Sequence, residues 1–121
     1  MVPNSLNNLT LLYESQEKYK DAEPLLRRSL EIREKALGPD HPEVANSLNN
    51  LAELYRTQWM YDKAEPLYKR SLEIVEKALG PDHPSVVIVI ENMVKLYKSM
   101  GREEEAKNLE ERAKAIRSSN K

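Results

Sequence analysis

Apolar residues recur every three or four positions along most of the chain, and short polar breaks separate one series from the next. One such series ends near Tyr55 and another begins near Ala64, with the segment RTQWMYD between them. A period of 3.6 residues is typical of amphipathic helices that bury one face. The pattern predicts an all-α fold with helices over residues 4 to 16, 20 to 37, 43 to 58, 62 to 79, 85 to 99 and 103 to 117.

Turn-forming residues support these boundaries. Asp62 and Glu65 have the spacing of a capping box, which predicts a helix start there. Gly80 can adopt the positive φ that ends a helix, and Pro81 beyond it cannot continue the helix. Pro84 suits the first position of the next helix. Each pair of helices is therefore expected to form a helical hairpin.

The chain repeats itself with a period of 42 residues. Residues 4–45 and 46–87 are identical at 29 of 42 aligned positions, and the stretch from Glu34 to Pro42 recurs unbroken as Glu76 to Pro84. A third, more divergent copy follows in the same phase. The sequence thus predicts one domain over residues 1–121, with repeats of about 1–42, 43–84 and 85–121, the last serving as a C-terminal cap.

The segments SLNNLAELY, DKAEPLYKRSLEI and EKALGPDHP resemble the 42-residue class of tetratricopeptide repeats found in kinesin light chains. The resemblance implies a right-handed α-solenoid of three helix-turn-helix repeats with six antiparallel helices, and a role as a protein-binding scaffold. Trp59 departs from the family pattern because the turn there often holds Gly. The family's packed signature positions correspond here to Leu48, Leu51, Ala52, Tyr55, Ala64, Tyr68 and Ser71.

The resemblance also implies that the first helix of each repeat lines a concave groove. An Asn stands at an equivalent groove position in every repeat, as Asn8, Asn50 and Asn92. A side-chain amide offers a donor and an acceptor, so it can pair with a peptide backbone. Alternatively, these amides only brace adjacent helices. The predicted groove residues are Asn7, Asn8, Asn46, Asn49, Asn50, Glu53, Arg56, Glu91, Asn92, Lys95 and Lys98.

The groove residues also suggest which peptide would bind. Arg56, Lys95 and Lys98 would make its C-terminal half locally basic, which favours an acidic or aromatic-acidic peptide. The whole chain, in contrast, carries 19 basic and 20 acidic residues, so no overall field attracts nucleic acid or an anionic membrane. A protein or peptide partner is therefore the expected ligand.

Composition excludes several other classes. The chain has no cysteine, and the apolar run from Val86 to Ile90 is far too short to cross a bilayer. His41 and His83 occupy the same place in two GPDHP turns, where a tight turn before a helix accounts for them better than a metal site or a general base does. We expect a cytoplasmic protein that is not an enzyme, with no catalytic residue, cofactor, metal or small-molecule substrate.

Self-association is the alternative function. The opening MVPNSL aligns with EVANSL of the second repeat, so the chain is expected to begin within a repeat and to leave a stacking face open near Leu11. The segment around Trp59 and Met60 has neither Gly nor Pro to stop a helix. The helices of the middle repeat are thus expected either to fuse and exchange between two copies in a homodimer, or to keep a turn of another geometry.

Overall fold

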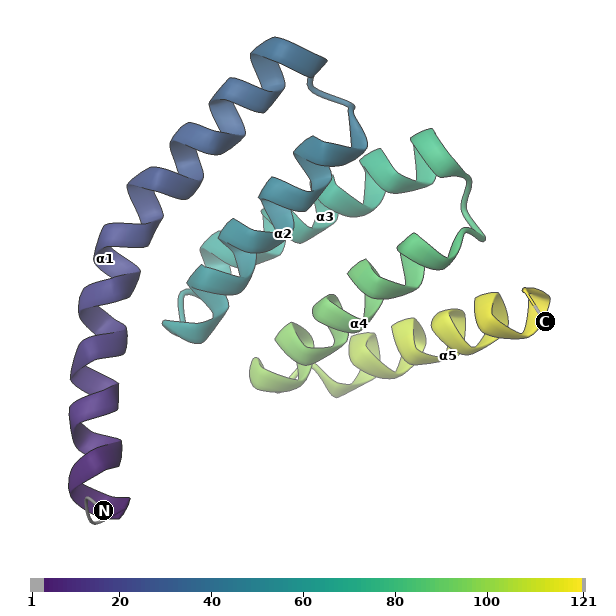
Figure 1. Ribbon diagram of the computed structural model, residues 1–121. Coiled ribbons are helices and arrows are strands. Elements are labelled where there is room, and N and C mark those ends of the chain that lie inside the picture. The colour runs from purple at the N-terminus through teal and green to yellow at the C-terminus, as the bar shows by residue number, and fades with distance from the viewer. Residues whose placement is uncertain (1–3, 121) are drawn as a thin grey trace.

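The computed structural model describes the backbone of residues 4–120 and the side chains of residues 18–120. This part of the chain is all-α and contains no strand. Helices α2 and α3 form one antiparallel hairpin, and α4 and α5 form a second (Figure 1). Helix α1 packs against α2, and α3 packs against α4. The five helices are α1 (Asn4–Leu37), α2 (Pro42–Thr57), α3 (Tyr61–Leu79), α4 (Pro84–Ser99) and α5 (Glu103–Ser119).

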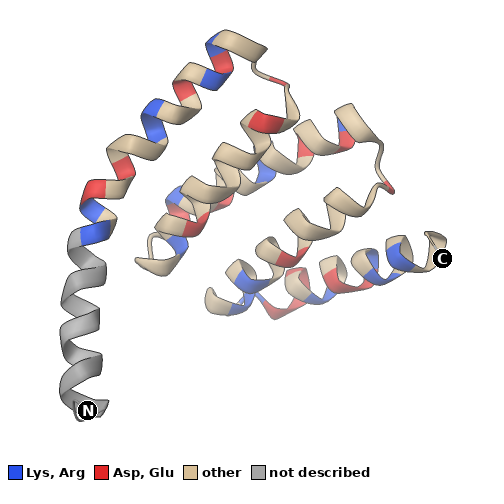
Figure 2. Ribbon diagram, viewed as in Figure 1, with Lys and Arg blue, Asp and Glu red and all other residues tan. Residues whose placement is uncertain are grey.

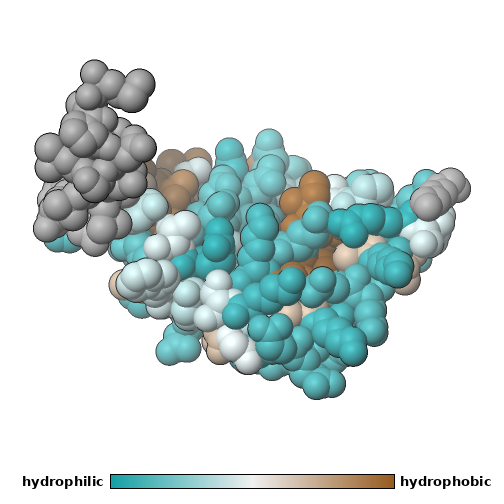
Figure 3. Space-filling model, turned by 90° about the horizontal axis from the view of Figure 1, so that it is seen from below, coloured by the Kyte–Doolittle hydropathy of each residue, from teal (hydrophilic) through white to brown (hydrophobic). Residues whose placement is uncertain are grey.

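The core lies between and within the two hairpins. Small side chains at Ala52 and Ala64 are fully buried, which lets α2 and α3 approach closely, and the Ser71 hydroxyl donates a 3.2 Å hydrogen bond to the Ala45 carbonyl. All seven predicted signature positions are buried, as expected for an amphipathic helix pair with neighbours on both sides. Seen from below, most of the surface is hydrophilic and apolar surface is confined to small areas (Figure 3).

The turns within the two hairpins share one geometry. The amide of Met60 bonds the carbonyl of Tyr55, and the amide of Trp59 bonds that of Arg56, a pairing known as the Schellman motif. The second hairpin repeats it 42 residues later, with Gly101 in place of Trp59. Both residues have positive φ, 62° at Trp59 and 76° at Gly101. A left-handed conformation costs a residue with a β-carbon roughly 1–2 kcal/mol, so Trp59 is strained.

The connections between repeats are capped by histidine. His41 Nδ1 accepts a 3.1 Å hydrogen bond from the amide of Glu43, and His83 Nδ1 accepts one of 3.0 Å from the amide of Ser85. Helices α2 and α4 begin directly after these residues, at Pro42 and Pro84. Each histidine therefore satisfies a first-turn amide that has no partner within the helix.

The first repeat differs from the prediction. Residues expected to form two helices, 4 to 16 and 20 to 37, form the single helix α1, so the chain has five helices over the described backbone instead of six. The fusion considered for the middle repeat is absent, because a turn separates α2 from α3. Neither Glu17 nor Trp59 favours a left-handed turn. The middle hairpin packs against both α1 and α4, and this packing offsets the backbone strain of the left-handed Trp59. Helix α1 packs only against α2 in the described residues, so less packing is available to offset such strain at Glu17.

The predicted capping box at the start of α3 is also wrong. The helix begins one residue earlier, at Tyr61, with Met60 as the N-cap and no side-chain hydrogen bond to the first turn. The carboxylate of Glu65 instead accepts hydrogen bonds from the Tyr97 hydroxyl and the Arg102 guanidinium. The spacing of Asp62 and Glu65 predicts a helix cap, but the Glu65 side chain instead bonds residues of the next repeat.

Candidate functional site

Helix α2 leaves one polar stripe open to solvent. Asn46, Asn50, Glu53 and Thr57 are exposed, and their spacing places them on one side of the helix. The opposite side carries the buried apolar residues, such as Leu48. The buried side of α2 packs against the neighbouring helices. The polar stripe is therefore the side of α2 that a partner can contact.

Helix α4 carries an equivalent stripe 42 residues later. Ile88 is 59% exposed, Lys95 is exposed and Asn92 is half-buried. Helices α2 and α4 are in contact, so the two stripes lie on neighbouring helices (Figure 1). We call this surface the α2–α4 face, and it comprises Asn46, Asn50, Glu53, Ile88, Asn92 and Lys95.

A small cleft lies at the seam between α2 and α4. It has a volume of about 190 Å³, and its lining includes Asn46, Asn49 and Ile88 together with Val75 of α3. The Asn49 Oδ1 atom is buried there and has no hydrogen-bond partner among the described residues. An unpaired buried acceptor carries a desolvation cost that a ligand N–H could relieve.

None of the amides on this surface braces a neighbouring helix in the structure. Asn46, Asn49, Asn50 and Asn92 form no side-chain hydrogen bond with any described residue. The nearby hydrogen bond between α1 and α2 uses Ser47, whose hydroxyl accepts from Arg33 at 2.8 Å. The amides therefore remain available as donors and acceptors.

Charged residues at the C-terminal edge are paired with one another. Glu91 lies 2.9 Å from Arg117, and Lys98 lies 3.4 Å from Glu110, so both predicted groove residues are engaged with α5. These pairs border a cleft of about 570 Å³ between α4 and α5. Basic and acidic residues alternate along α5 (Figure 2). This edge is consequently a polar surface of nearly balanced charge.

The comparison with known proteins identifies the repeats. A family model described as Tetratricopeptide repeat matches residues 2–73 and again residues 60–119. The chain belongs to the tetratricopeptide repeat family. Its repeats resemble those of kinesin light chains, which confirms the class predicted from the sequence.

Solved structures agree with this assignment. The crystal structure of BtubC (BKLC) from P. vanneervenii aligns with a TM-score of 0.79 and 29% identity, over 93% of this chain and 45% of that one. The crystal structure of nearly identical TPR-like repeats from a kinesin light chain-like protein of Podosopora anserina aligns with a TM-score of 0.77 and 26% identity, over 97% of this chain and 56% of the other. The chain therefore spans about half the length of these relatives.

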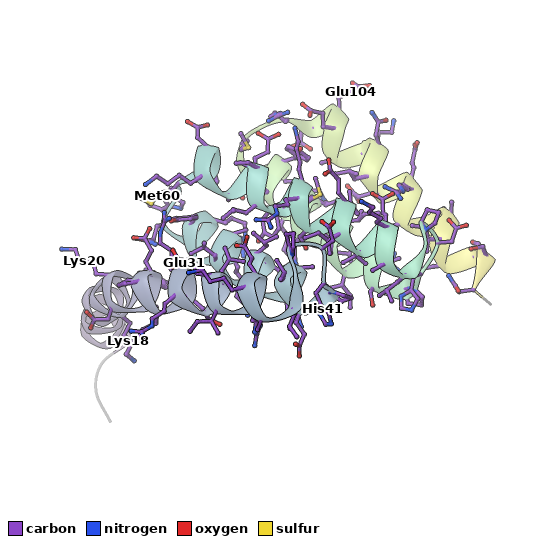
Figure 4. The ribbon with its side chains drawn as sticks, turned by 90° about the horizontal axis from the view of Figure 1, so that it is seen from above. Lys18, Lys20, Glu31, His41, Met60 and Glu104 are labelled. Atoms are coloured by element: carbon purple, nitrogen blue, oxygen red, sulfur yellow. The ribbon has the colours of Figure 1, made fainter. Side chains whose placement is uncertain are left out.

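The remaining predicted residues of this tetratricopeptide repeat chain lie in different places. Arg56 is half-buried near the C-terminal end of α2, 3.7 Å from Glu53, and its Nε atom has no partner among residues 18–120. Trp59 is 81% exposed, and Met60 beside it is also exposed. Met60 lies at the same end of the helix stack as Lys20 and far from His41 (Figure 4). The side chains of Asn7, Asn8 and Leu11 lie outside the described residues.

Sequence reasoning missed a set of polar contacts that join consecutive repeats. The Tyr55 hydroxyl donates to Glu23 Oε2 at 2.5 Å, and Tyr97 donates to Glu65 Oε2 at 2.9 Å. Basic side chains complete both contacts, since Arg27 bonds the Tyr55 hydroxyl and Arg102 bonds Glu65. The signal was present in the sequence, because each Glu and each Tyr recurs after 42 residues.

These contacts shift the pKa values of the residues that form them. Burial would raise the pKa of Glu65, but hydrogen bonds from Tyr97, Arg102 and Lys69 outweigh burial and hold the pKa below its usual value. Burial, together with the bond to Glu65, raises the pKa of Tyr97 to about 12. Both shifts favour the pair of an ionised carboxylate and a neutral phenol.

A second set of contacts anchors the connections between repeats. Arg70 lies 3.3 Å from Glu34 and also donates to the Pro39 carbonyl, so it ties α3 to the turn after α1. Arg112 repeats this arrangement with Glu76 and Pro81. These arginines serve the stacking of repeats and leave the α2–α4 face free.

Two further features concern chemistry and membranes. Within the described part of the chain, no three His, Asp or Glu side chains come together as a set that could hold a metal ion. No described helix is both long and apolar enough to cross a bilayer. The two histidines are used as helix caps.

Proposed function

We propose that the chain binds an extended segment of a protein partner across the α2–α4 face. Tetratricopeptide repeats generally mediate protein–protein interactions, and their fold is typically that of a non-enzymatic scaffold. The observation that carries the proposal is the row of amides on neighbouring helices, at Asn46, Asn50 and Asn92, with no hydrogen-bond partner among the described residues.

The amides suggest how such a segment is recognised. Each amide group can accept from a peptide N–H and donate to a peptide carbonyl, so recognition depends on the ligand's backbone more than on its sequence. The unpaired Oδ1 atom of Asn49 adds an acceptor at the seam. Exposed Ile88 and the adjoining cleft with Val75 offer a seat for one apolar side chain of the ligand. We therefore propose an extended segment with an apolar residue at this point.

The ion pairs formed by the predicted basic groove residues weaken the argument, made from the sequence, for an acidic ligand. Arg56 is paired with Glu53, and Lys98 is paired with Glu110. Lys95 is the basic residue of the α2–α4 face and forms no ion pair within residues 18–120. A single uncompensated charge contributes little at an exposed site. A ligand of mixed or neutral charge thus fits the proposed face better than a strongly acidic one.

The proposal is tested with an array of overlapping 15-residue peptides that samples protein sequences broadly, probed with the folded chain. We expect a set of binding peptides, and we expect Asn50→Ala and Asn92→Ala each to weaken their binding severalfold, since one hydrogen bond is worth about 0.5–1.5 kcal/mol. Asn108→Ala, at an exposed amide of α5 outside the face, is the matched control. Equal binding by all three variants would show that the amides of the face do not recognise the peptide.

Self-association is the second candidate, and a different surface supports it. Leu25 and Ile32 of α1 are 68% and 56% exposed, although the equivalent residues of the middle repeat, Leu67 and Ile74, are half-buried and 2% exposed. An apolar surface of this kind promotes association. The function proposed for this surface is the formation of a homodimer.

A further inference from the structure

Helix α1 exposes an apolar stripe at positions that other helices cover in the later repeats. Leu25 and Ile32 stand seven residues apart, which places them on the same side of the helix. The other side of α1 packs against the core through half-buried residues such as Leu26 and Leu30. We call Leu25 and Ile32 the α1 stripe. The stripe is directed away from α2, where no described element covers it.

The middle repeat shows what normally lies over these positions. There α2 packs against α3, and Leu48, Leu51 and Tyr55 of α2 and Ile74 of α3 are all buried. The segment that corresponds to α2 in the first repeat is residues 4–16, NSLNNLTLLYESQ, which matches NSLNNLAELYRTQ at 9 of 13 positions. It has leucine or tyrosine at each corresponding position. By sequence, the cover that fits the α1 stripe is therefore the segment 4–16 of this same chain.

The segment 4–16 cannot reach the stripe of its own chain in this structure. Residues 4–37 form one continuous helix, which rises about 1.5 Å per residue, so residues 4–16 extend along the axis away from Leu25 and Ile32 (Figure 1). Residues 4–16 of a second copy can supply this cover, or α1 can break near residue 17 so that its own segment does. Breaking would place Glu17 in the position that Trp59 holds with a φ of 62°, at a cost of roughly 1–2 kcal/mol.

We propose that two copies of the chain exchange residues 4–16. Each copy lays this segment on the α1 stripe of the other, so the two α1 helices run antiparallel around a two-fold axis near residue 17, the position equivalent to the turn at residue 59. The interface then reproduces the packing of α2 on α3, and neither copy needs a left-handed residue at Glu17. Such an exchange closes on itself as a dimer. The inference rests on the second proposed function, self-association, and gives it a mechanism.

The experiment measures the mass of the full chain by light scattering after size exclusion, at high micromolar concentration. The exchange requires twice the monomer mass of 14.0 kDa. Glu17→Gly should convert the dimer to a monomer, because Gly adopts positive φ freely and lets α1 close into a hairpin. Trp59→Gly is the matched control, since it makes the same change in a turn that is already formed, and it should leave the mass unchanged. Glu17→Ala should remain dimeric.

A second variant addresses the stripe itself. Ile32→Lys places a charge on the surface that the exchange buries and should also yield a monomer, with helix content retained on circular dichroism. A monomeric wild-type chain overturns the exchange and dimerisation together. A dimer that persists in both Glu17→Gly and Ile32→Lys overturns the exchange alone, and leaves self-association through another surface.

Discussion

The hydroxyl of Tyr97 lies 2.9 Å from Oε2 of Glu65, a carboxylate 32 residues earlier in the chain. The same relationship holds between Tyr55 and Glu23, also 32 residues apart. Each pair joins the second helix of one repeat to the first helix of the next. Stacked repeats depend on such contacts between neighbours more than on the stability of single hairpins. The Glu–Tyr pairs are therefore expected to contribute to the cooperativity of folding.

The first prediction concerns acid. The pKa of Glu65 is lowered in the folded chain, so its contribution to stability is present above the unfolded-state pKa and is lost as the pH falls through the folded-state value. Glu65→Gln should lower the free energy of unfolding at neutral pH and flatten its decline with acid. Urea unfolding at several pH values measures both effects. Glu73→Gln, at an exposed residue of the same helix, is the control, and an equal change in that variant would contradict the prediction.

The second prediction concerns alkali. The pKa of Tyr97 is raised to about 12, so the stability it contributes is complete below the unfolded-state pKa and is lost as the pH rises through about 12. Tyr97→Phe should remove this part of the alkaline decline and cost about 1.5–3 kcal/mol at neutral pH, as for other hydrogen bonds to charged groups. Ultraviolet titration of tyrosinate in the wild type and the variant measures the shift. A Tyr97 that ionises at the ordinary tyrosine pKa of about 10 would refute it.

The third prediction concerns the strained turn of the middle repeat. Trp59→Gly should raise the free energy of unfolding by about 1 kcal/mol, because Gly accepts the left-handed conformation that Trp59 holds. Trp59→Ala removes the same exposed indole but keeps a β-carbon, so its stability should stay close to that of the wild type. Thermal unfolding of both variants separates backbone strain from the loss of the side chain. An equal gain in both would mean that strain is not the cause.

The fourth prediction concerns the histidine caps. His83→Ala should destabilise the chain by about 1 kcal/mol, because the amide of Ser85 loses its hydrogen-bond acceptor. His83→Asn should lose far less, since an asparagine oxygen can accept the same bond. Denaturant unfolding of the two variants makes the comparison, and equal losses would show that the cap is not what His83 contributes.

The last four helices could be located from the sequence. Their bounds fall within one or two residues of those predicted, because Gly80, Pro84 and Gly101 mark turns and because the apolar period is regular. The first repeat could not be predicted in the same way. Glu17 and Trp59 are equally poor turn residues, and the choice between turn and helix depends on how much neighbouring surface each hairpin can bury. That is a property of the assembled array.

The candidate site could be predicted only in part. The exposure of Asn46 and Asn50 follows from helical spacing and from the family resemblance, and the structure has both side chains open. The engagement of Glu91 and Lys98 with α5 was not foreseen. It arises because Arg117 and Glu110 occupy positions that hold Val75 and Tyr68 in the preceding repeat. Partners far apart in sequence become visible only when the helices are packed.

The central claim is that the α2–α4 face binds an extended peptide, and nuclear magnetic resonance tests it most directly. A peptide selected from the array is titrated into the isotope-labelled chain while backbone and asparagine side-chain amide signals are followed. We predict that the largest shifts fall in α2 and α4, with the side-chain amides of Asn46, Asn50 and Asn92 among them, and that Asn108 of α5 stays unchanged. Shifts confined to α1 or to the cleft between α4 and α5 would contradict the account.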